Sequence, residues 1–148
     1  MCTLLDILAT KGTGAVAIAP HATLHEAARA MHDLGIGSLV VGSTQAPVGL
    51  LSERDLVRRL AVDRHAGDVT VQQVMGPVVE VDGEADSVYC LHLMTERRLR
   101  HFLVFSQGSP VGIVSIGDLV KAHIDEQHRA IAELDSYLHS RPSAAVAG

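Results

Sequence analysis

Several residue types that mark whole classes of protein are scarce in this sequence of 148 residues. It has no tryptophan, two tyrosines, two phenylalanines and two cysteines. Cys2 stands beside the initiator methionine and Cys90 lies within an apolar helical pattern, which indicates neither a disulfide framework nor a zinc knuckle. No apolar run approaches the length of about eighteen residues that a membrane-spanning helix needs. We therefore expect a soluble globular chain with no membrane partner.

Positive charge is also in deficit, because 12 lysines and arginines stand against 17 aspartates and glutamates and the net charge is −5. Nucleic-acid affinity grows with the number of phosphates that Lys and Arg neutralise, so we expect no nucleic-acid partner and at most a local anion site. The N-terminal stretch MCTLLDILATKG has no basic residues before its apolar ones and contains Asp6. This pattern is unlike a secretory signal, and we expect a cytoplasmic location.

One passage of the sequence occurs twice. Residues 47–57 read PVGLLSERDLV and residues 110–120 read PVGIVSIGDLV, with seven of eleven positions identical at an offset of 63 residues. The same offset aligns the two halves without a gap from about Val16 to Lys121. A repeat of this length indicates two copies of one structural unit.

Each copy predicts the same order of elements, β-α-β-β-α. The predicted strands are 15–19, 38–42 and 46–51 in the first copy and 78–81, 101–105 and 109–114 in the second. The predicted helices begin at Thr23, Ser52, Asp86 and Ser115, and the last reaches about Tyr137. The sequence thus predicts an α/β (α+β) fold of two repeats with pseudo-twofold symmetry and small sheets flanked by helices. We divide it into 1–66, with an N-terminal helix, 67–127, and a helical extension with a frayed tail, 128–148.

Each copy places the motif G-h-h-S-x-x-D, where h is apolar, at the junction of its last strand and last helix. Order, duplication and junction motif together resemble the tandem cystathionine-β-synthase (CBS) domain pair, or Bateman module, over about residues 3–125. The segments TERRLRHFLVF and GIVSIGDLVKAHIDE are similar to those of stand-alone bacterial CBS-pair proteins. The resemblance implies a homodimer that forms through the helices.

The Ser-x-x-Asp motif has two interpretations. Ser52 with Asp55, and Ser115 with Asp118, fit helix caps that only satisfy free amides. A helix N-terminus also stabilises a phosphate, and an Asp one turn into the helix can accept hydrogen bonds from the two ribose hydroxyls. In the family that the sequence resembles, this motif holds the phosphate and ribose of adenine nucleotides. That resemblance implies Ser52 and Asp55 for one interdomain cleft and Ser115 and Asp118 for the other.

The two copies differ in charge near this motif. Arg54, able to fork onto a phosphate, stands where the second copy has Gly117, which weakens the second motif. The second copy reads RRLRH at 97–101 where the first reads LGIGS. Arg98, Arg100 and His101 are therefore candidate phosphate ligands, although arginines at a helix end can also just complement its dipole. We expect one dominant site able to take a polyphosphate and one weaker or empty site.

Metal binding and catalysis have little support in the sequence. His21 and His25, and His123 and His128, lack the spacing or third ligand of a zinc site, so we expect surface histidines. The motifs of a nucleophile elbow, a P-loop and a zinc protease are missing. We expect a protein that is not an enzyme and requires no cofactor.

Two functions remain open. The first is a regulatory sensor that binds an adenosine-containing nucleotide, with AMP or ATP as first candidates, changes shape, and acts on an unknown downstream protein. The alternative is a homodimeric interaction protein that needs no ligand. It rests on an apolar stripe in residues 124–138, formed by Ile124, Ile131, Leu134 and Leu138, which could meet a second copy.

Overall fold

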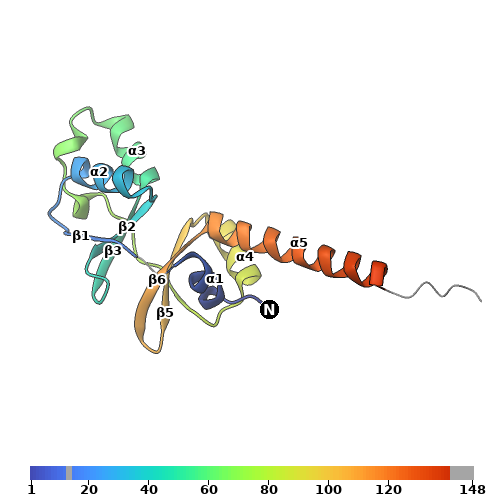
Figure 1. Ribbon diagram of the computed structural model, residues 1–148. Coiled ribbons are helices and arrows are strands. Elements are labelled where there is room, and N and C mark those ends of the chain that lie inside the picture. The colour runs from blue at the N-terminus through green and yellow to red at the C-terminus, as the bar shows by residue number, and fades with distance from the viewer. Residues whose placement is uncertain (13–14, 141–148) are drawn as a thin grey trace, which may run out of the picture.

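The computed structural model describes residues 1–12 and 15–140, and Figure 1 shows two lobes from which one long helix projects. The helices and strands are α1 (Leu4–Lys11), β1 (Ala17–Ile18), α2 (Leu24–Leu34), β2 (Ser38–Gly42), β3 (Pro47–Ser52), α3 (Glu53–Val62), the short 3-10 helices η1 (Ala66–Asp68) and η2 (Val71–Gln73), β4 (Glu80–Asp82), α4 (Ser87–Arg97), β5 (His101–Ser106), β6 (Ser109–Ser115) and α5 (Ile116–Ser140). The predicted order of elements is confirmed in both repeats.

Each lobe is built on one three-stranded mixed sheet, in the order β1-β2-β3 in the first lobe and β4-β5-β6 in the second. The first two strands of each sheet are parallel and the last two are antiparallel. A parallel neighbour needs a crossover connection, which α2 and α4 supply. The register repeats at the same offset of 63 residues, since Val40 faces Leu50 and Leu103 faces Ile113.

The helices start at the capping residues that the sequence predicted. Thr23 Oγ1 accepts the Glu26 N–H at 3.1 Å, and the Glu26 carboxylate accepts the Thr23 N–H at 2.9 Å, which completes a capping box at the start of α2. At the start of α4, Asp86 accepts the Tyr89 N–H. The last helix, α5, is longer than predicted, because it continues to Ser140.

The N-terminal helix lies in the second lobe, whereas we grouped it with the first repeat. Leu4, Ile7 and Leu8 of α1 are buried in the core that α4, β5 and β6 form. The Leu4 N–H donates to the Ala85 carbonyl at 3.2 Å, and the Ser87 N–H donates to the Cys2 carbonyl at 2.8 Å. The apolar stripe of α1 needs a surface that can bury it, and the second sheet provides that surface.

The segment between the repeats makes the reciprocal contact with the first lobe. Ala66 and Val71 are fully buried in the first core. The Leu24 N–H donates to the Val69 carbonyl at 2.9 Å and the Val71 N–H donates to the Ala22 carbonyl at 2.7 Å. Each lobe is thus completed by the segment that leads into the other repeat.

A third apolar cluster joins the two sheets. Its buried members are Val40, Leu103 and Ile113, and Ala15, Leu50, Val78 and Phe105 pack against it. Three pairs in this cluster are equivalent positions of the repeat: Ala15 and Val78, Val40 and Leu103, and Leu50 and Ile113. The lobes therefore meet through matching faces.

The position of α1 predicts the effect of shortening Leu4, which is fully buried. Leu4→Ala should lower the free energy of unfolding by about 2–5 kcal/mol, because it removes buried methyl groups and leaves a cavity. Leu34→Ala, at a side chain that is 56% exposed at the end of α2, is the matched control and should cost less than about 1 kcal/mol. Urea unfolding followed by circular dichroism measures both, and equal losses would contradict the packing of α1 in the second core.

Candidate functional site

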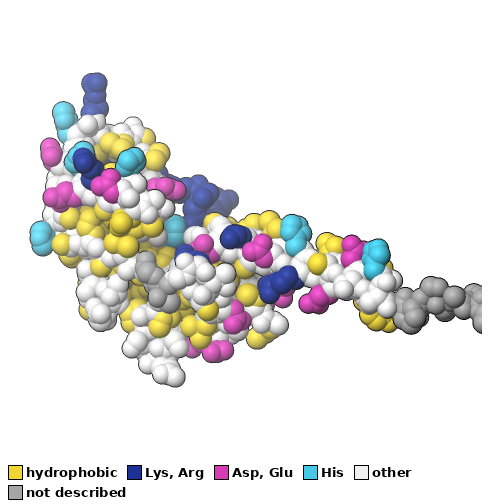
Figure 2. Space-filling model, in the orientation of Figure 1, with side chains coloured by type: hydrophobic (Ala, Val, Ile, Leu, Met, Phe, Trp, Pro, Cys, Tyr) yellow, Lys and Arg dark blue, Asp and Glu magenta, His cyan; other side chains and the backbone are white. Residues whose placement is uncertain are grey.

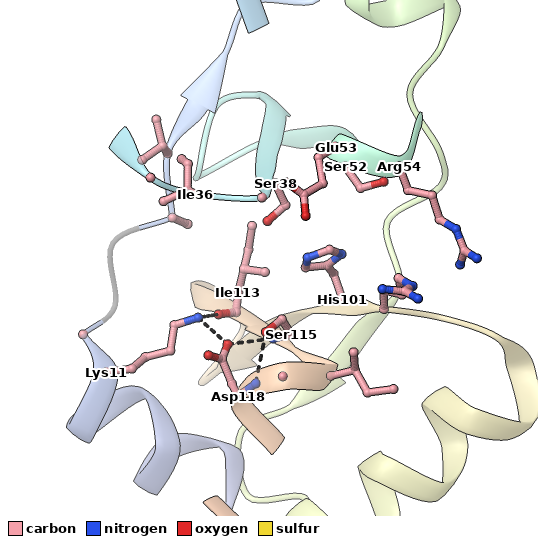
Figure 3. A pocket seen from close by; sticks show the side chains of 18 of the residues that line it. Lys11, Ile36, Ser38, Ser52, Glu53, Arg54, His101, Ile113, Ser115 and Asp118 are labelled. Carbon is pink, nitrogen blue, oxygen red and sulfur yellow. Dashed lines mark hydrogen bonds and ion pairs between the residues drawn. The ribbon is translucent and has the colours of Figure 1, made fainter. Parts of the chain in front are cut away.

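A cleft of about 920 Å³ lies between the two lobes (Figure 3). Both repeats contribute to its walls. The polar and charged residues that line it are Lys11, Ser38, Ser52, Glu53, Arg54, Arg100, His101, Ser115 and Asp118, and its apolar lining includes Ala15, Val16, Ile36, Val57, Ile113 and Ile116. Both Ser-x-x-Asp motifs border this one cleft, where we expected a separate cleft for each.

Both serines cap their helices, so the predicted caps are confirmed. Ser52 Oγ accepts the Asp55 N–H at 3.2 Å, and Ser115 Oγ accepts the Asp118 N–H at 3.1 Å. In return, each Asp accepts its serine's backbone N–H at 2.8 Å. The caps orient the N-termini of α3 and α5 toward the cleft, where the exposed amides of each helix start favour an anion.

The first amide of each helix is already bonded. The Glu53 N–H donates to the Gly37 carbonyl at 2.9 Å, and the Ile116 N–H donates to the Arg100 carbonyl at 2.8 Å. The next amide in each helix, at Arg54 and at Gly117, has no hydrogen-bond partner within residues 1–12 and 15–140. Both residues line the cleft, so their amides are candidates to bind an anionic group of a ligand.

The two aspartates of the repeated motif have different positions. Asp118 lines the cleft, whereas Asp55 does not. Asp55 Oδ2 accepts both the N–H and the hydroxyl of Ser52, at 2.8 and 2.9 Å. The ribose role that we gave to Asp55 stays a prediction, and the position of Asp55 outside the lining of the cleft argues against it.

Asp118 is held by Lys11, a contact that the sequence did not indicate. Lys11 Nζ donates to Asp118 Oδ2 and, at 3.0 Å, to the Ile113 carbonyl. Burial raises the pKa of Asp118, but the hydrogen bonds from Lys11 and Ser115 outweigh this effect and leave the pKa below its usual value. Asp118 is therefore ionised at neutral pH. Finding Lys11 required knowing that α1 packs on the second lobe.

The cationic residues predicted from the RRLRH segment divide into two groups. Arg100 and His101 line the same cleft as Arg54, so the structure brings together side chains from the two repeats. Arg98 does not line the cleft, and it ends α4 as an exposed residue with φ 55°. Figure 3 shows His101 pointing into the cleft between Ser52 and Ser115.

His101 is the most enclosed of these cationic candidates. Burial lowers its pKa below the ordinary value, the charge of Asp118 opposes this shift, and the charge of Lys11 adds to it. His101 is therefore neutral at neutral pH and can offer one ring N–H as a donor. Glu53, which the sequence analysis did not single out, adds a carboxylate to the same wall.

Two further observations concern the described part of the chain. None of its helices has the length and apolar character needed to cross a membrane. Within residues 1–12 and 15–140, no three His, Cys, Asp or Glu side chains gather as they would around a metal ion. The cytoplasmic location stays a prediction.

Comparison with known proteins agrees with the fold and the repeat. Residues 6–62 and 67–125 each match the CBS domain family. The crystal structure of a CBS-domain containing protein from Agrobacterium tumefaciens is 33% identical, with a TM-score of 0.78 over 82% of this chain and 99% of that one. CBS domain-containing protein CBSX3, mitochondrial, of Arabidopsis thaliana is 29% identical over 92% of this chain and 71% of its own length.

A third relative, CBS domain-containing protein YhcV of Bacillus subtilis, is 28% identical over 74% of this chain and 79% of its own length. Together the two family matches span both lobes and both Ser-x-x-Asp motifs. The chain therefore belongs to the CBS domain family, and its two repeats form a tandem CBS-domain pair.

Proposed function

We propose that this protein is a non-catalytic regulatory module that binds one adenine nucleotide in the cleft between its lobes. The observation that carries the proposal is the composition of that cleft. Two helix N-termini, two arginines and an ionised carboxylate lie beside an apolar wall in a single cavity. A phosphate, a ribose and a base need these three kinds of surface, and the cavity volume of about 920 Å³ suits a ligand of this size.

The arrangement of side chains favours one orientation of the ligand. The base packs on the apolar side, near Ile36 and Ile113. The ribose hydroxyls bond the carboxylate of Asp118, and the phosphate lies near Arg54 and Arg100, where a planar guanidinium can bind two of its oxygens. In Figure 3, Ile36 and Arg54 lie at opposite ends of one wall of the cleft, and Asp118 lies on the facing wall beside Lys11.

A solved relative supports the ligand class. A CBS domain protein from Pyrobaculum aerophilum, complexed with AMP, has the same fold, with a TM-score of 0.70 and 24% identity over 79% of this chain. The fold can therefore hold AMP. A regulatory signal would follow if the nucleotide prefers one arrangement of the two lobes over another, since only differential affinity shifts such an equilibrium. A downstream protein would then recognise the favoured arrangement.

Asp118 and Asp55 provide a matched test of this proposal, because they occupy equivalent positions of the repeat and both belong to helix caps. Asp118→Asn should weaken AMP binding about 10- to 100-fold, since hydrogen bonds to a charged acceptor are worth about 1.5–3 kcal/mol. Asp55→Asn should leave the affinity within about twofold, because Asp55 does not line the cleft. Isothermal titration measures both.

Thermal melting of the two variants is the control, because each loses part of a cap. Both should melt at similar, slightly lower temperatures than the wild type. Equal losses of AMP affinity in the two variants would contradict the role that we assign to Asp118.

The projecting part of α5 favours a second function, self-association. Apolar side chains that are 42–61% exposed recur along the helix at Val120, Ile124, Ile131, Leu134 and Leu138. With Gln127 included, the steps between these positions alternate between four and three residues. This spacing is that of a coiled-coil seam in which Gln127 is the one polar member. Figure 2 shows yellow side chains along this helix beyond the lobes. We propose that two copies pair along this seam as a homodimer.

Ile131→Asp tests the seam, because it places a charge where the partner helix would pack. The variant should elute with the mass of one chain, while the wild type elutes with twice that mass, in size-exclusion chromatography with light scattering. Ala132→Asp adds the same charge at the next residue, which is exposed and lies off the seam, and should leave the mass unchanged. A dimer that survives Ile131→Asp would contradict pairing through α5.

A further inference from the structure

Lys11 connects the N-terminal helix to the cleft. It is the last residue of α1, and both of its hydrogen-bond acceptors, the Ile113 carbonyl and Asp118 Oδ2, belong to the end of the second repeat. In Figure 3 it reaches Asp118 from the side of the cleft away from Arg54. The side chains of Lys11 and Asp118 are 38% and 25% exposed. An ion pair this exposed adds little net stability, so a competing ligand can replace it.

The same two residues border a second hollow. This hollow, of about 570 Å³, lies between α1 and α5, and its lining includes Asp6 and Thr10 of α1 and Lys121 and Asp125 of α5. Lys11 and Asp118 line both this hollow and the cleft. Their ion pair therefore lies where the two spaces adjoin, and its loss would change how the end of α1 contacts α5.

The oxygens of Asp118 are unequally occupied. Oδ2 accepts the Ser115 N–H and Lys11 Nζ, which uses both of its lone pairs. Oδ1 has no hydrogen-bond partner in the part of the chain that the structure describes. A ribose presents two neighbouring hydroxyls, and a carboxylate receives them best with one on each oxygen. Lys11 must then leave Oδ2, because the Ser115 N–H belongs to the cap of α5.

We propose that Lys11 is a latch that ties the end of α1 to Asp118 in the empty protein and is displaced when a ribose binds. This inference rests on the proposed nucleotide site. Leu4, Ile7 and Leu8 keep the rest of α1 in the second core, so the change is confined to the last turn of the helix. Occupancy of the cleft is thereby transmitted to the N-terminal helix, where a partner protein could detect it.

Lys11→Met tests the latch with adenosine as the probe, because adenosine has no phosphate that the lysine could attract. The variant should bind adenosine about two- to fivefold more tightly than the wild type, since no ion pair has to be broken. Lys121→Met is the matched control: Lys121 lines the hollow but not the cleft, and its loss should leave the affinity unchanged. Lys11→Gln should behave as Lys11→Met does.

Hydrogen exchange supplies a second readout at the end of α1, where the Gly12 N–H donates to the Leu8 carbonyl at 2.8 Å. Saturating adenosine should speed exchange of this amide in the wild type, and Lys11→Met should show the faster exchange without ligand. Unchanged or weaker adenosine binding by Lys11→Met, alongside Asp118-dependent binding by the wild type, overturns the latch and leaves the proposed function standing. If neither the wild type nor Lys11→Met binds adenosine or AMP, both the latch and the proposed nucleotide site are overturned.

Discussion

The contact between the two sheets determines the rest of the site. Leu50 of β3 and Ile113 of β6 lie in the cluster that joins the lobes, and Ser52 and Ser115 follow each of them by two residues. Packing of these two strands therefore brings two helix N-termini to opposite walls of one cleft. Their separation depends on close-packed apolar side chains, which resist small displacements. A ligand that contacts both walls acts directly on this contact.

The frame of the cleft is nearly symmetric, but its chemistry is not. Arg54 and Gly117 occupy equivalent positions of the repeat, and Asp118 lines the cleft while its equivalent, Asp55, does not. Lys11 reaches only the second motif, because α1 packs on the second lobe. These differences place the two arginines in one part of the cleft and the carboxylate of Asp118 where the cleft adjoins the hollow between α1 and α5. Such a polarity suits one asymmetric ligand better than two equivalent ones.

The sequence predicted those features that depend on local pattern. The order of the elements and the helix caps follow from residues a few positions apart, the repeat follows from a constant offset of 63 residues, and all are confirmed. The lobe that α1 covers could not be predicted, because both sheets offer an apolar face and only packing decides between them. For the same reason, the sequence did not predict the contact between Lys11 and Asp118, which are 107 residues apart. Arg98 and Arg100 are close in sequence, yet Arg98 is the left-handed cap that follows α4 and Arg100 leads directly into β5, and only Arg100 lines the cleft.

Calorimetric titration of the wild-type protein with AMP tests most directly whether both repeats build one composite site. A single site shared by the two lobes predicts one molecule of AMP for each chain, with a single binding isotherm. Two equal sites for each chain would contradict it, because each Ser-x-x-Asp motif would then hold its own nucleotide. A titration without any binding heat, together with no rise in melting temperature at millimolar AMP, would contradict AMP binding altogether.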